Sequence, residues 1–86
     1  MPTISRFYGI TITMYWDDHV PPHFHARYGD HKAVVRFDTC ELLKGSLPPR
    51  QRRLVLAWAE LRRGELEEDW NIARASGTLK AIDPLR

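Results

Sequence analysis

The sequence contains a single cysteine and no long apolar run. Cys40 stands alone among 86 residues, so no disulfide can form within the chain and the fold must be held by packing. A reducing compartment is the simplest setting for such a chain. The N-terminus lacks the apolar segment of a signal peptide, and no stretch approaches the roughly 20 apolar residues of a membrane helix. The expected location is the cytoplasm, without membrane contact.

An excess of one charge is also missing. The chain has 13 Lys and Arg residues and 11 Asp and Glu residues, which gives a formal net charge of +2. Net charge alone therefore does not indicate a nucleic-acid-binding protein. The hydrophobic share of 43% is typical of a globular chain, and a chain of this length has room for one core. We expect a single domain over residues 1–86.

Histidine is concentrated in one segment, WDDHVPPHFHARYGDH, which runs from Trp16 to His31. It contains all four histidines of the chain, His19, His23, His25 and His31. Imidazole changes its charge near neutral pH and is a common metal ligand. If the protein has a functional site, we expect it in this segment.

The N-terminal part of the chain alternates apolar and polar residues with the period of a β-strand. The alternation covers residues 7–16, 23–28 and 32–38, and turn-forming residues separate the three runs. The pattern predicts an antiparallel three-stranded meander, with residues 42–43 as a candidate fourth strand. The face opposite the core is predicted to present Thr11, Thr13, Tyr15, His23, His25, Arg27 and Arg36.

Two helices are expected in the C-terminal part. Leu54, Trp58 and Leu61 recur at helical spacing after a Pro-Pro pair that suits a first turn. The charge then reverses from basic to acidic around Gly64, as it does where one helix ends and the next begins. The predicted fold class is α+β, with a small antiparallel sheet of three to four strands packed on two C-terminal helices. The last residues are expected to form a short strand or an extended tail packed by Ile82.

Four segments of the chain together resemble a known bacterial family. They read PTISRFYGI, DDHVPPHFHARYGDHKA, LLKGSLP and WAELRRGELEEDW, and PPHFHARYG is the most specific part. The family is catalogued as domain of unknown function 4160, and the resemblance covers nearly the whole chain. It implies a compact intracellular protein, often encoded beside another small protein in an arrangement like a toxin–antitoxin pair. The resemblance brings no established catalytic residues with it.

The first hypothesis for the site is metal binding. His23 and His25 are two residues apart on a predicted strand, so their rings point the same way and can share a zinc ion or another divalent transition metal. The further candidate ligands are His19, Asp17 or Asp18 from the preceding loop and His31 from the following turn. The alternative is that these imidazoles bond to the backbone or to carboxylates.

The second hypothesis is metal-independent cleavage of RNA. This reaction needs an acid and a base that work near pH 7 and a cation for the phosphate. The candidate catalytic residues are Tyr15, His23, His25 and Arg27, with Arg36 as a second cation. The balanced charge of the N-terminal part argues against this hypothesis.

The third hypothesis is an interaction module. A small protein encoded nearby would dock on the exposed sheet face with its histidines and aromatic side chains, or on an unpaired strand edge, and no catalytic geometry is needed. The sequence favours this interpretation: one component of a two-protein, toxin–antitoxin-like system, with the His-rich hairpin as its functional surface. The alternative is a small RNA-cleaving or metal-dependent hydrolytic enzyme. Self-association into a homo-oligomer is compatible with both.

Overall fold

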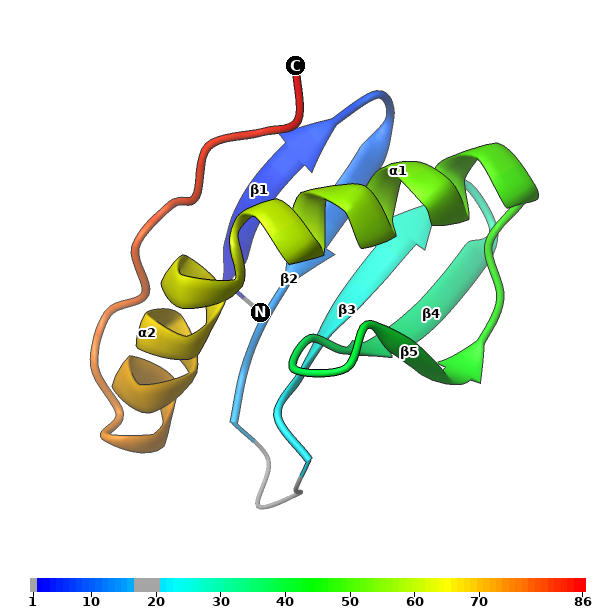
Figure 1. Cartoon of the computed structure of the whole chain (residues 1–86). Helices are drawn as coiled ribbons and strands as arrows, with labels where there is room; N and C mark the ends of the chain where they lie inside the picture. Colours follow the sequence, from blue (N-terminus) through cyan, green and yellow to red (C-terminus); the bar gives the residue numbers. More distant parts are fainter. Residues whose placement is uncertain (1, 17–20) are drawn as a thin grey trace.

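The computed structural model describes residues 2–16 and 21–86, which form a five-stranded antiparallel sheet followed by two helices (Figure 1). The strands lie side by side in their sequence order, β1-β2-β3-β4-β5. The α+β class is thus confirmed, with a wider sheet than the predicted three to four strands. The elements are β1 (Thr3–Phe7), β2 (Ile10–Thr13), β3 (His23–Tyr28), β4 (His31–Arg36), β5 (Glu41–Gly45), α1 (Pro49–Leu61) and α2 (Arg63–Arg74).

β1 is the strand that the alternation pattern does not predict. The pattern runs on from Phe7 as if into one strand, but the structure turns the chain at Tyr8 and Gly9. Their φ angles are 50° and 80°, the left-handed values that a two-residue hairpin turn requires. The turn folds β1 back along β2, where Phe7 lies opposite Ile10. This hairpin adds Ile4 and Phe7 to the core.

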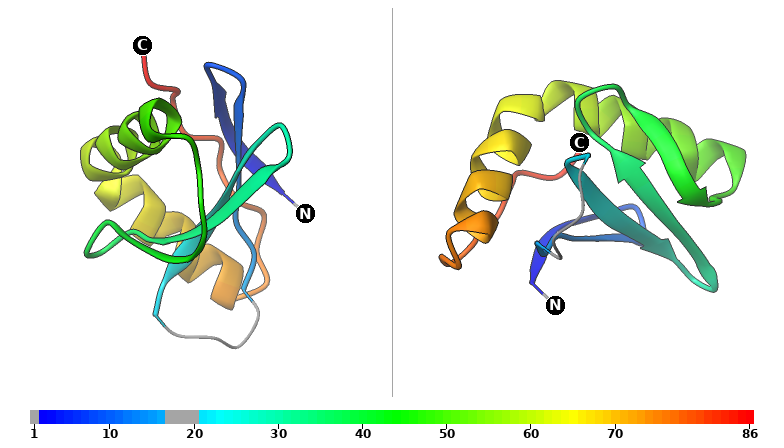
Figure 2. Two further views of the ribbon diagram at one scale, coloured as in Figure 1. Left: turned by 90° about the vertical axis from the view of Figure 1, so that its right-hand side faces the viewer. Right: turned by 90° about the horizontal axis from the view of Figure 1, so that it is seen from below.

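The core lies between one face of the sheet and the two helices, which occupy the same side of it (Figures 1 and 2). Trp58 of α1 packs on Phe7 and Phe24, with ring centroids 5.3 and 5.6 Å apart, respectively. Trp70 of α2 packs on Phe37. Apolar residues of the alternating segments are buried on the face that the helices cover: Ile10, Ile12, Met14, Phe24, Ala26, Val35 and Phe37.

Two separate helices are present, as the charge reversal predicts, but the break is at Arg62. Arg62 leaves helical geometry with φ −106° and ψ 21°, and its carbonyl accepts the first bond of α2 from the Leu66 amide at 2.9 Å. Gly64 therefore lies in the first turn of α2 and does not end α1. Neither helix of the described chain is both long and apolar enough to cross a bilayer.

The C-terminal residues form an extended tail beside α2 and β1 (Figure 1). The Lys80 amide donates to the Asp69 carboxylate at 2.9 Å, and the Ile82 amide donates to the Ile4 carbonyl at 2.7 Å. Trp58 Nε1 also donates to the tail, at the carbonyl of Asp83. Of the two predicted alternatives for this segment, the extended tail packed by a buried Ile82 is correct.

Candidate functional site

The sheet face opposite the helices carries a hollow of about 710 Å³ to which all five strands contribute. Its lining residues with a fixed charge are the four cations Arg6, Arg27, Lys32 and Lys44. No acidic side chain lines it within the described part of the chain. None of the four cations makes an ion pair with a residue in 2–16 or 21–86, whereas Arg36, Arg62 and Lys80 elsewhere do. The hollow therefore concentrates positive charge that the described protein does not neutralise.

Strand register places three of these cations in one row across the sheet. Arg6 lies opposite Thr11, Thr11 lies opposite Arg27, and Arg27 lies opposite Lys32. Residues directly opposite in antiparallel strands project from the same face, with Cβ atoms about 4.5–5.5 Å apart. Arg27 and Lys32 are thus adjacent like charges, an arrangement that destabilises a sheet unless an anion binds there. We call Arg6, Thr11, Arg27 and Lys32 the cationic row.

A second row beside it has a different chemistry. Thr13 lies opposite His25, His25 lies opposite Val34, and Val34 lies opposite Lys44. The ring of Tyr15 stacks on that of His25, with centroids 4.8 Å apart and planes 12° apart. Tyr15 and His25 both line the hollow. This stacked pair provides a flat aromatic surface next to the cationic row.

His23 is not among the residues that line the hollow, although it is two residues before His25 on β3 and was expected on the same face. Its side chain is only 5% exposed, because its ring packs 5.2 Å from the ring of Trp70 in α2. Its Nδ1 is 3.0 Å from the Pro21 carbonyl, which can only accept, so Nδ1 carries the proton in this bond. The expectation that His23 is presented on the open face is therefore wrong, and Trp70 is the reason.

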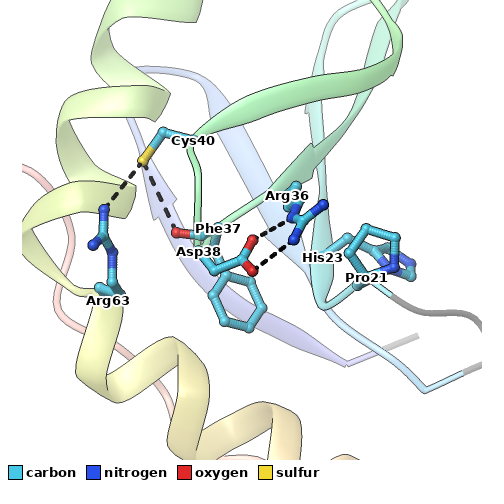
Figure 3. A network of polar contacts seen from close by, with 7 residues as sticks. All are labelled: Pro21, His23, Arg36, Phe37, Asp38, Cys40 and Arg63. Carbon is cyan, nitrogen blue, oxygen red and sulfur yellow. Dashed lines mark hydrogen bonds and ion pairs between the residues drawn. The ribbon is translucent and has the colours of Figure 1, made fainter.

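Arg36, the predicted second cation, is also engaged elsewhere. It lies opposite His23 and donates from its guanidinium group to both carboxylate oxygens of Asp38, at 2.5 and 3.0 Å (Figure 3). This bidentate bond is the main reason why the pKa of Asp38 falls below its ordinary value. Of the predicted RNA-cleaving set, the hollow brings together Tyr15, His25 and Arg27.

The predicted metal ligands are only partly brought together. The rings of His23 and His25 are 5.4 Å apart and meet edge to face. His31 is exposed at the start of β4, opposite Tyr28, at the far end of the hairpin. The loop candidates His19, Asp17 and Asp18 lie outside the described residues. Within residues 2–16 and 21–86, no group of three or more His, Cys, Asp or Glu side chains is arranged to hold a metal ion.

Three of the four cations were not singled out by the sequence pattern. Arg6 belongs to β1, the strand that the alternation does not predict. Lys32 carries a usable signal, because a tight turn at Gly29-Asp30 pairs it with Arg27. Lys44 joins the face through a register shift between β4 and β5: Val34 pairs with Lys44, but Val35 pairs with Leu42. The sequence pattern does not predict this shift.

Residues 9–71 match the family described as Domain of unknown function (DUF4160). The chain belongs to this family. The DUF4160 segment contains β2 to β5, α1 and most of α2, so it includes every lining residue of the hollow except Arg6. Comparisons with curated proteins and with solved structures gave no match.

Proposed function

We propose that this chain is the RNA-binding component of a small two-protein system and that the hollow on its open sheet face holds the RNA. The observation that carries the proposal is the set of four cations that line one hollow without an acidic neighbour among the described residues. Contacts with phosphate supply essentially all of the non-specific affinity of proteins for nucleic acids and a large share of the specific affinity. A surface of this kind suits a ligand with several negative charges.

The aromatic pair beside the cations favours single-stranded RNA. Proteins that bind single strands combine cations for the backbone with aromatic side chains on which bases stack, often on the face of a small sheet. Tyr15 and His25 supply such a surface within the same hollow. A double helix would not offer unstacked bases to this pair.

The balanced net charge of the chain does not oppose the proposal, because charge is unevenly distributed. Acidic side chains are concentrated in α2, where Glu65, Glu67 and Glu68 are exposed on the helix side of the sheet. Asp38 is held by Arg36 and is not a lining residue of the hollow. The local charge of the hollow is thus far more positive than the average of the chain.

The second protein of the system is expected to act on the same surface. A partner that restrains an RNA-binding protein can do so by covering its binding face, and here it would need acidic side chains opposite the four cations. The protein would then still act as an interaction module. Its partner protein would dock on the open face of the sheet and not on the His23–His31 hairpin alone.

RNA binding is tested by fluorescence anisotropy with a labelled short single-stranded RNA. We expect the double variant Arg27→Gln/Lys32→Gln to bind at least tenfold more weakly than the wild type, because two cations that bind phosphate are removed. The matched control is Arg52→Gln/Arg53→Gln, which removes the same charge from the exposed surface of α1. An equal decrease in both variants, or no binding by the wild type, would overturn the proposal.

Cleavage of the bound RNA is a second candidate, favoured by the position of His25 in the hollow with Arg27 and Tyr15. The imidazole of His25 would take the proton of a ribose 2′-hydroxyl, whose oxygen bonds to phosphorus while the bond to the 5′-oxygen breaks. The departing oxygen takes a proton from water, and Arg27 neutralises charge on the phosphate. The product would end in a 2′,3′-cyclic phosphate.

This candidate is tested by incubating RNA with the wild type, His25→Ala and the control His31→Ala. We expect cyclic-phosphate products from the wild type and the control and none from His25→Ala. Equal cleavage by all three would point to a contaminating nuclease and would end the candidate. Cleavage that a chelator abolishes would instead favour the metal-dependent alternative, with His23 and His25 among the ligands.

A further inference from the structure

We infer that the RNA backbone crosses the sheet at right angles to the strands, with its phosphates on the cationic row and its bases over the Tyr15–His25 pair. This inference rests on the proposed function and adds the direction and the orientation of the bound strand. It follows from how strand register divides the open face into two rows of different chemistry.

The cationic row is long enough to hold more than one phosphate. Neighbouring strands lie about 4.8 Å apart, so a row from β1 to β4 spans about 14 Å. Arg6 and Lys32 stand at its two ends and Arg27 lies between them, opposite Lys32. The hydroxyl of Thr11 adds a neutral donor of the type that commonly binds phosphate oxygens.

The neighbouring row is suited to bases. Between β2 and β4 it consists of Thr13, His25 and Val34, and none of these carries a fixed positive charge. Tyr15 extends the aromatic surface by stacking on His25. A single strand of RNA likewise has its phosphates along one side and its bases along the other. When the RNA crosses the sheet, its phosphates lie on the cationic row while its bases lie on the row of Thr13, His25 and Val34.

A path parallel to the strands would meet far fewer of these groups. Arg27 is the one Arg or Lys side chain of β3. Along the open face of β4, Lys32 is followed by Val34 and then by Arg36, which is bound to Asp38. A backbone that follows one strand therefore meets one cation that has no ion pair among the described residues, whereas a backbone that crosses the strands meets three such cations.

The test is the salt dependence of RNA affinity for single variants. For single strands, each cation that binds a phosphate contributes about 0.7 to the slope of log K against log salt. We expect Arg6→Gln, Arg27→Gln and Lys32→Gln each to lower the slope by about this amount, whereas Arg6→Lys and Lys32→Arg keep it. Arg52→Gln on α1 is the matched control and should leave the slope unchanged.

The base side is tested with Tyr15→Leu, which removes an aromatic face and no charge. We expect the affinity to fall about tenfold with an unchanged slope, because stacking does not release counterions. Tyr15→Phe keeps the ring and should bind like the wild type. A lowered slope in Tyr15→Leu would overturn the inference.

The outcomes separate this inference from the proposed function. If the wild type binds RNA but Arg6→Gln keeps the full slope, the backbone does not cross to β1 and the inference falls while RNA binding stands. If the wild type does not bind RNA at all, both fall. Melting temperatures close to that of the wild type establish that each variant is folded.

Discussion

A buried carboxylate in α2 is the residue with the most unusual setting. Asp69 is 1% exposed, and its Oδ1 accepts the Lys80 amide at 2.9 Å. Its Oδ2 has no hydrogen-bond partner in the described part of the chain. Burial is the main reason why its pKa rises above the ordinary value, and the negative charges of Glu68 and Glu65 raise it further. Ionised Asp69 therefore costs stability in the folded state.

This cost predicts a pH-dependent effect of Asp69→Asn. Because the folded pKa is raised, the stabilising contribution of Asp69 is complete below the ordinary value of 3.8 and is lost as pH rises through the folded pKa. The free energy of unfolding of Asp69→Asn should thus improve relative to the wild type between acid and neutral pH. Urea unfolding at several pH values measures this difference, with Asp30→Asn in an exposed turn as the control. A difference that does not change with pH contradicts the argument.

Backbone conformation sets the position of β5, the element that brings Lys44 to the hollow. Gly45 has φ +75°, and a Cβ atom placed there would lie 2.0 Å from the Lys32 carbonyl oxygen. That oxygen accepts the Ser46 amide at 3.0 Å. Glycine at this position therefore allows the end of β5 to approach β4 closely.

The expected result is that Gly45→Ala lowers the free energy of unfolding by clearly more than Gly29→Ala. Both glycines have a positive φ, so both substitutions carry a strain of about 1 kcal/mol. Only Gly45 adds a backbone clash, since a Cβ atom at Gly29 would meet nothing within 4 Å among the described atoms. Chemical denaturation of the two variants gives the comparison, and equal decreases would show that the close approach is unimportant.

Elements with a repeating local pattern could be predicted from the sequence, whereas β1, which depends on an unusual turn, could not. The alternation around Phe24 and Val35 and the helical spacing around Trp58 follow from the period of each element, so the core was predictable. β1 was not predicted, because its turn to β2 is formed by Tyr8 and Gly9 and not by the usual Asn-Gly or Asp-Gly pair. Tyr8 fits a strand pattern, so the sequence gives no clear sign of a turn there.

The sequence predicted the segment that contains the candidate site, but not all of the residues that line the hollow. The segment around His25 and Arg27 does line the hollow. The burial of His23 depends on Trp70, which is far away in the sequence. Arg6 lies at the site because the β1–β2 hairpin places it opposite Thr11, and the sequence pattern does not predict the turn of this hairpin. The contact between His23 and Trp70 is long-range, so no local period contains it.

At the scale of the whole molecule, the C-terminal tail links both helices to the sheet. Ile82 is 4% exposed and bonds to Ile4, and Trp58 bonds to the carbonyl of Asp83 at 2.8 Å. The tail lies outside the matched DUF4160 segment, as does β1, with which it pairs. The two segments, which come from opposite ends of the described chain, therefore add neighbouring residues to the core, Ile4 from β1 and Ile82 from the tail.

We expect Ile82→Ala to lower the free energy of unfolding by about 2 kcal/mol or more, because a buried isoleucine leaves a cavity when it is truncated. Ala81→Ser, at the exposed neighbouring position, should have little effect. Tryptophan fluorescence during urea unfolding measures both variants. Equal stability of Ile82→Ala and the wild type would mean that the tail is not part of the cooperative fold.

The bond between Ile82 and Ile4 also limits how copies of the protein can assemble. Growth of a fibre by strand addition requires two open edges on each molecule, one to join and one to extend. Here the tail lies against the outer side of β1, so β5 provides the open edge of the described sheet. Two molecules that pair through β5 would leave only β1 edges that the tail partly covers, so this route favours a dimer over a fibre.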